Sequence, residues 1–207
     1  MTAFVTLDNV RPTAFWRRPI DGVDFPTKGI LAFGVRRTST HVHQGVDLFA
    51  PLGTRVRAPT DGIVVWALDK WRRGFTRYGK VVVIESDQGP NVLLSHLDTV
   101  AVKEGQRVHQ AQTVGTVGKT AFTKEQPNRV FAHSKPHLHL EVSANAYPMR
   151  SEAARIDPLP FFDPSHPVRV TEPGETAKRV EGTSNVRPVA TIGGLLLIKL
   201  GASRLLK

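Results

Sequence analysis

Short runs of apolar and branched residues, separated by turn residues, recur through most of the first 150 positions of the chain. Branched and aromatic side chains favour strands, and the glycine and proline clusters between the runs favour turns. The pattern predicts strands at residues 55–58, 62–67, 80–85, 91–94 and 137–142. We therefore expect a mainly β, antiparallel fold with a barrel-like or sandwich-like arrangement. One or two helical turns are expected near the end of the domain, at Ser151–Arg155.

The chain of 207 residues is long enough for one domain with a proper core and short appended segments. We expect the domain at residues 18–162, an N-terminal arm at residues 1–17 and a C-terminal extension at residues 163–207. The extension begins with a proline-rich and charged stretch that indicates a linker. Its last part, residues 189–207, is apolar but basic and too short to span a membrane. It is expected to contact a membrane surface, to pair with another chain in a virion, or to pack back on the domain.

Two stretches far apart in the chain carry candidate metal ligands. His43 and Asp47 are four residues apart, and His137 and His139 are two residues apart. Side chains alternate across a strand, so the members of each pair are expected to share a face. A catalytic zinc takes three nitrogen or oxygen ligands and leaves a fourth position to water or substrate. Two histidines and one aspartate meet this need and leave one histidine over.

Three further side chains bear on the same chemistry. His96 follows an apolar run and is a candidate acid or base, because histidine titrates near neutrality. His41 shares strand parity with His43, so it is expected to line the groove, although spacing alone also allows it the ligand role. Glu141 shares a face with His139 and either orients its ring or is a solvated carboxylate at a strand end.

The motifs His43–Asp47, Leu94–Leu97 and His137–Val142 stand in the order found in one known family. The chain resembles the lysostaphin-type, LytM-like zinc metalloendopeptidases, which cut peptides of bacterial peptidoglycan. The resemblance covers the expected domain, residues 18–162. It implies a bacteriolytic hydrolase, a metalloprotease that cuts the peptide cross-links or stem peptides of the cell wall.

By this resemblance, His43, Asp47 and His139 bind one zinc ion. His96 and His137 then form the catalytic pair, which stabilises the oxyanion and handles the proton. A non-catalytic module on the same scaffold, which binds peptidoglycan or serves as a virion component, is the alternative. Loss of ligands would mark that alternative, and all five residues are present in this sequence.

Two polar stretches lie near these motifs in the sequence. Residues 120–135 contain proline and are predicted to form a surface loop, which by the resemblance would wall the substrate groove. Residues 69–80 mix three aromatic residues with five cationic ones. They form either a site for an anionic wall polymer or a hairpin loop whose aromatic residues cover an edge of the core, and we favour the loop.

The formal net charge of +10 favours polyanionic partners, among them the bacterial wall. The sequence has no recognisable DNA-binding motif or aromatic stacking pattern, so no specific nucleic acid is expected. The absence of cysteine excludes disulfides and a thiol nucleophile. The first residues do not resemble a secretory signal. We therefore expect a phage or prophage lysin that acts at the cell wall after release through a holin, as an endolysin, or as part of a phage particle.

Overall fold

The protein is seen in a computed structural model, which describes residues 15–39, 41–87, 89–125, 135–144, 155–163, 165, 169–171 and 178–179. The strands within these ranges are β1 (Val46–Phe49), β2 (Arg55–Arg57), β3 (Gly62–Leu68), β4 (Lys80–Ser86), β5 (Asn91–Val100), β6 (Arg107–Val108), β7 (Thr113–Val117), β8 (His137–Ser143), β9 (Arg155–Ile156), β10 (Arg169–Thr171) and β11 (Lys178–Arg179). One short helix, α1 (Leu159–Phe162), follows β9. The prediction of a mainly β, antiparallel fold is confirmed.

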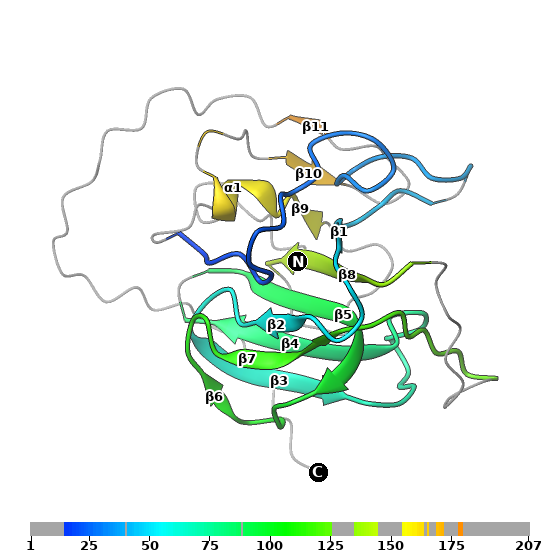
Figure 1. Cartoon of the computed structure of the whole chain (residues 1–207). Coiled ribbons are helices and arrows are strands. Elements are labelled where there is room, and N and C mark those ends of the chain that lie inside the picture. The colour runs from blue at the N-terminus through cyan, green and yellow to red at the C-terminus, as the bar shows by residue number, and fades with distance from the viewer. Residues whose placement is uncertain are drawn as a thin grey trace, which may run out of the picture.

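The strands form one 11-stranded sheet with β5 at its junction. Strand β5 pairs with β4, β7 and β8, and all three pairings are antiparallel. Strands β3 and β6 extend the sheet beyond β4, and β9 to β11 extend it beyond β8, where Figure 1 shows them with α1 in the upper part of the molecule. Among the described strands, no pairing closes the sheet into a barrel. Because β1 also pairs with β8, the three sequence motifs meet around β8 and β5.

The main hydrophobic cluster takes its side chains from one face of β8 and from alternate residues of β4. Leu138, Leu140 and Val142 of β8 and Val82 and Ile84 of β4 are fully buried in it. Full burial of a side chain of this size stabilises a fold by about 1.5–3 kcal/mol. The intervening residues of β4 belong to a second cluster on the other face. The polar residues of β8 also face away from the main cluster, because successive side chains alternate.

The predicted helix at Ser151–Arg155 is wrong at its last residue, and residues 151–154 lie outside the described ranges. Arg155 begins β9, which pairs with β8 through Ile156 opposite Val142 and with β10. Pairing with neighbouring strands outweighs the weak local helix preference of this segment. Within the described ranges, α1 is the only helix, and it is too short to cross a bilayer.

Both ends of the expected domain have neighbours in the fold. Trp16, in the predicted N-terminal arm, is 5% exposed, and its ring centroid lies 4.6 Å from that of Phe161 and 5.9 Å from that of Phe162. The Trp16 amide donates to the Phe161 carbonyl at 2.9 Å. Strands β10 and β11 lie within the stretch predicted as a linker. The predicted tail at residues 189–207 lies outside the described residues.

The loop between β3 and β4 supports the hairpin prediction. Phe75 is 2% exposed and belongs to the second cluster, with Tyr78 packed against it. The Arg72 guanidinium lies 4.3 Å from the centroid of the Trp66 ring, so one of the cations is already in contact with an aromatic face. Phe75 and Tyr78 therefore cover an edge of the core, as the favoured alternative expected of the loop's aromatic residues.

The surface loop predicted at residues 120–135 is wrong at its beginning. Thr120 and Phe122 are buried. Residues 126–134 of the predicted loop lie outside the described ranges. The Thr120 hydroxyl donates to the carbonyl of Leu97 at 2.8 Å and accepts from the amide of Lys80 at 2.9 Å. These bonds hold the chain against β4 and β5. The polar sequence of the segment could not predict them, because their partners are distant in the chain.

Candidate metal centre and its histidines

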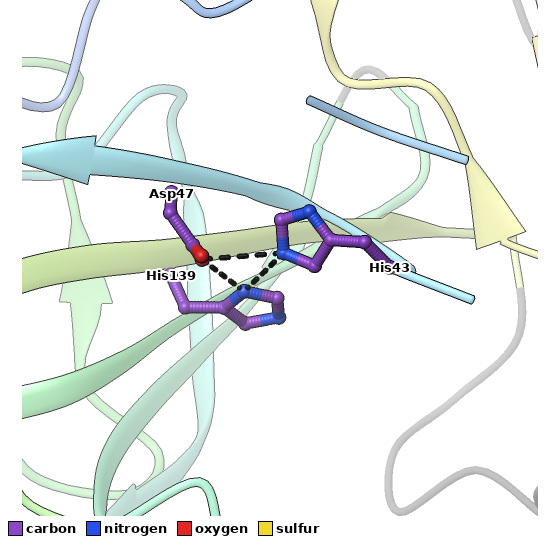
Figure 2. Close-up of side chains that lie close together, drawn as sticks. All are labelled: His43, Asp47 and His139. Carbon is purple, nitrogen blue, oxygen red and sulfur yellow. Dashed lines mark hydrogen bonds and ion pairs between the residues drawn. The ribbon is translucent and has the colours of Figure 1, made fainter. Parts of the chain in front are cut away.

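Three candidate ligands converge where β1 lies beside β8. Asp47 and His139 stand directly opposite one another across the antiparallel pair, so their side chains share a face. Nδ1 of His139 lies 2.8 Å from Oδ1 of Asp47. Nε2 of His43, just before β1, lies 3.2 Å from that oxygen and 3.2 Å from Nδ1 of His139. Figure 2 shows the two rings and the carboxylate pointing toward one another.

These three atoms fit a metal ion of the size and preference of zinc. Zinc takes nitrogen and oxygen ligands at about 2.0–2.1 Å, and tetrahedral geometry then sets ligand atoms about 3.3 Å apart. The observed separations of 2.8 and 3.2 Å are close to this value. Two nitrogens and one oxygen would leave the fourth tetrahedral position open to water or substrate, as a catalytic zinc site requires.

Three successive backbone carbonyls, those of residues 30–32, hold the first motif from behind. The Ala32 carbonyl accepts a hydrogen bond from Nδ1 of His43 at 2.9 Å, which leaves the Nε2 lone pair of that ring for a metal. The carbonyl of residue 31 accepts a hydrogen bond from the Asp47 amide at 3.0 Å. The carbonyl of residue 30 accepts one from Nε of Arg37 at 2.8 Å. The same Arg37 donates through Nη2 to Oδ2 of Asp47. Asp47 therefore presents Oδ1 to the other ligands.

Gly45 lets the chain pass close over β8 between the two ligands of the first motif. A Cβ atom at this position would lie 2.2 Å from the carbonyl oxygen of Leu140 and 2.9 Å from Cε1 of His139. Real side chains do not tolerate such contacts, so only glycine fits. Close passage here is what brings His43 within reach of Asp47 and His139.

Glu141 holds the far side of the His139 ring. The Nε2–H of His139 donates to Oε1 of Glu141 at 3.0 Å, and Nε of Arg155 donates to Oε2 at 2.9 Å. Glu141 is 2% exposed, so of the two alternatives for this residue the solvated carboxylate is wrong. A carboxylate behind a ligating histidine fixes its tautomer and its orientation.

The electrostatics of the cluster follow from burial and from these contacts. Burial would raise the pKa of Asp47, but hydrogen bonds from His139 and His43 hold it far below its usual range. Burial would lower the pKa of His139, but its bonds to Asp47 and Glu141 outweigh burial and raise the pKa to about 9. Burial lowers the pKa of His43. His139 thus holds, in the metal-free protein, the proton that a metal must displace.

His96 is placed by an irregularity in β5. Its φ of 61° lies in the left-handed region, and the registers of β5 with β4 and with β7 both shift nearby. Non-glycine residues in this region cost energy and are typical of functional sites. Nδ1 of His96 donates to the Thr120 carbonyl at 2.8 Å, which leaves the lone pair on Nε2. The ring centroid lies 4.8 Å from that of His137 and 5.7 Å from that of His139.

His137 lies beside the candidate ligands on β8. Its Nδ1 donates to the Lys135 carbonyl at 2.9 Å, and its Nε2 lies 4.0 Å from Oδ1 of Asp47. Burial lowers the pKa of His137, so its ring is neutral at neutral pH. Phe49, which is 45% exposed, stands edge-on to this ring with centroids 5.8 Å apart. The candidate site therefore has an accessible aromatic side chain at its border.

The structure brings all five predicted residues, His43, Asp47, His96, His137 and His139, into one cluster. Within the described ranges, His43, Asp47 and His139 form the only group of three or more His, Cys, Asp or Glu side chains whose ligand atoms lie close enough together to hold a metal. His41 is exposed and does not belong to that group. The separate roles of the five predicted residues, as metal ligands or as catalytic residues, stay a prediction.

Four neighbours of the site were not identified from the sequence. They are Arg37, Tyr78, Thr120 and Arg155. Each comes from a loop or a short strand and reaches the site through tertiary contacts, so no periodic pattern marks it. The helix predicted at Ser151–Arg155 hid the strand position from which Arg155 reaches Glu141.

Comparison with known proteins gives concordant matches. Residues 41–151 match the family model described as Peptidase family M23. The glycyl-glycine endopeptidase ALE-1 of Staphylococcus capitis is 34% identical over 123 residues, which are 58% of this chain and 29% of that protein. The DD-carboxypeptidase/endopeptidase Mpg of Neisseria meningitidis serogroup B is 34% identical over 108 residues, 52% of this chain and 21% of that protein. The matches thus span less than a third of either relative.

Among solved structures, the catalytic domain of lysostaphin from Staphylococcus simulans is similar to this chain. The two are 26% identical with a TM-score of 0.51, over 63% of this chain and 88% of that domain. A peptidase M23 structure from Pseudomonas aeruginosa is 27% identical with a TM-score of 0.50, over 73% of this chain and 52% of that one. Both likenesses agree with the mainly β fold described above.

Proposed function

The chain belongs to peptidase family M23, and from this premise we propose that it is a zinc-dependent endopeptidase that hydrolyses peptide bonds of bacterial peptidoglycan. One observation carries the proposal: His43, Asp47 and His139 converge with ligand-like separations, and His96 and His137 stand beside them. Relatives named as endopeptidases support the reaction class. The intact set of five residues counts against the non-catalytic alternative.

A zinc ion held by the three ligands would polarise the scissile carbonyl and lower the pKa of the attacking water. The two other histidines supply the acid–base groups. Each has its Nδ1 bonded to a backbone carbonyl, so each offers Nε2 as the reactive nitrogen. Neutral His137 is able to accept a proton, and a protonated ring is able to donate to the oxyanion or to the leaving amine. We assign proton transfer and oxyanion stabilisation to His96 and His137 as a pair.

Two bond classes are open to such a site. A glycine bridge is suggested by the name of the Staphylococcus capitis relative, and a direct cross-link between stem peptides by the name of the Neisseria relative. Both relatives are 34% identical to this chain, so similarity favours neither. The substrate test must therefore contain walls of both kinds.

The test is to incubate the purified protein with peptidoglycan of each cross-link type, with and without a zinc chelator, and with zinc added back. Turbidity and released amino groups are followed. His139→Ala serves as the inactive variant, and His109→Ala, at an exposed histidine, as its matched control. We expect new amino groups only with metal and only from proteins that keep His139. No release from a folded, zinc-loaded protein would favour the binding-module alternative.

We also propose that the protein acts at the bacterial cell wall. The net charge of +10 supports attraction to a polyanionic surface. A phage or prophage origin, with holin release or carriage on a virion, stays a prediction. The proposed contact of residues 189–207 with a virion or membrane surface stays a prediction as well.

A further inference from the structure

Glu141 is held by three donors that come from three separate parts of the chain. Oε1 accepts from Nε2–H of His139 at 3.0 Å and from the hydroxyl of Tyr78 at 2.8 Å. Oε2 accepts from Nε of Arg155 at 2.9 Å. The partners lie on β8, in the loop before β4 and on β9, respectively. A buried carboxylate bound at both oxygens cannot turn without breaking a charge-assisted bond, so its direction is fixed.

Tyr78 contacts both halves of the candidate site. Its hydroxyl donates to the carboxylate behind His139, and its backbone carbonyl accepts the amide of His96 at 2.9 Å. That second bond is made at the residue whose backbone is left-handed, with φ of 61°. Strained backbone persists only where its surroundings hold it. The position of Tyr78 therefore bears on the metal ligand and on the catalytic histidine at once.

The Tyr78 ring is itself held in place. It packs on the second hydrophobic cluster, with its centroid 6.4 Å from that of Phe75 and 6.1 Å from that of His139. Gly79 follows with φ of 66°, and a Cβ there would lie 2.2 Å from the Thr120 carbonyl, the acceptor for His96. Tyr78 thus contacts the site through its ring, its hydroxyl and its backbone carbonyl.

From these contacts we propose that Glu141 and Tyr78 are positioning residues of the zinc site. Glu141 turns His139 so that Nδ1 faces Asp47, and Tyr78 fixes Glu141 while it holds the backbone of His96. The metal half and the acid–base half of the site are in this way joined through one loop residue. This inference rests on the proposed function, because it gives the two residues their purpose in a zinc enzyme.

The first test is the zinc affinity of purified variants, measured by competition with a chromophoric chelator and without substrate. Glu141→Gln keeps the shape and removes the charge, and we expect zinc binding about tenfold to hundredfold weaker. Tyr78→Phe removes one hydroxyl, and we expect a loss of roughly threefold to tenfold. Glu85→Gln makes the same change at an exposed residue of β4 and is the matched control, so its zinc affinity should stay within about twofold of wild type.

The double variant Tyr78→Phe/Glu141→Gln separates positioning from a general weakening of the fold. If Tyr78 acts through Glu141, the double variant binds zinc as Glu141→Gln does, because the two effects are not additive. At saturating zinc, Tyr78→Phe should also lower kcat and leave KM unchanged, because the lost hydroxyl loosens Glu141 and with it the His139 ring, whereas the Tyr78 carbonyl that accepts from the His96 amide is kept. Additive losses of affinity would overturn the proposed link.

Zinc affinities equal to wild type in both single variants would overturn the proposal, and so would a wild type that binds no zinc. If Glu141→Gln does not fold, the affinity of Tyr78→Phe decides alone. A wild type that binds zinc but releases no amino groups from peptidoglycan would refute the proposed function. In that case the affinities of the variants still decide whether Glu141 and Tyr78 position the metal ligand.

Discussion

The metal-free protein is expected to lose stability as the pH rises from 6.5 to about 9, because of a single buried histidine. The pKa of His139 is raised from the ordinary 6.5 to about 9 by its bonds to Asp47 and Glu141, against the effect of burial. Between these pH values the folded protein keeps the proton and the unfolded chain has lost it. The stabilisation is therefore complete below 6.5 and disappears as the pH passes through the folded pKa.

The magnitude follows from the same two values. One pH unit corresponds to about 1.4 kcal/mol, so the difference between 6.5 and about 9 amounts to about 3 kcal/mol of unfolding free energy. Domains of this size are typically stable by only about 5–15 kcal/mol, so the loss is large enough to measure. Below 6.5 the slope should reverse, because burial lowers the pKa of His43 and of His137 and favours their neutral forms. Stability of the metal-free protein should therefore be greatest near pH 6.5.

The assay is urea unfolding in the presence of a chelator, at a series of pH values across this window. His139→Gln should remove the loss above pH 6.5, and His109→Gln, at an exposed side chain, should retain it. Zinc should also remove the loss, because the metal takes the place of the Nδ1 proton. Unfolding free energies of the metal-free wild type that stay constant or rise across the window would refute the reasoning.

Three further outcomes are expected. Gly45→Ala should cost at least about 2 kcal/mol of unfolding free energy and weaken zinc binding, because its Cβ would meet the Leu140 carbonyl at 2.2 Å; Gly89→Ala, with nothing within 4 Å, is the control in the same urea titrations. His96→Ala and His137→Ala should keep zinc but lose at least about a hundredfold in released amino groups, and an active variant at either position would contradict its catalytic role. Zinc should raise the melting temperature of the metal-free protein with increasing concentration, as calorimetry would show, and no change would contradict a zinc site.

Strand periodicity was enough to predict the parts of the site that lie on regular pairs of strands. The shared face of His137, His139 and Glu141 follows from alternation along β8, and the structure confirms it. The same alternation puts Asp47 on this face once β1 pairs with β8, because Asp47 is the pairing partner of His139. Regular strands allow such inference because the side chain direction is fixed by sequence number alone.

The irregular parts of the site could not be predicted in the same way. His96 owes its direction to shifts of register and a left-handed backbone, which no apolar pattern encodes. Arg155 was expected in a helix because its neighbours in sequence favour one, whereas its position depends on strands distant in the chain. The buried start of the segment at Thr120 looked like a surface loop because its hydroxyl finds partners only in the folded protein.

The carbonyls of residues 31 and 32 accept hydrogen bonds from Asp47 and His43, and the carbonyl of residue 30 accepts one from Arg37. All three lie outside residues 41–151, the region that the family model matches. A fragment trimmed to that region would contain every predicted ligand and neither the acceptor for Nδ1 of His43 nor Arg37, which grips Asp47. In such a fragment the His43 ring would be free to present either nitrogen. The metal site therefore depends on residues that precede the family match. A shortened version of the protein made for engineering should start before residue 30.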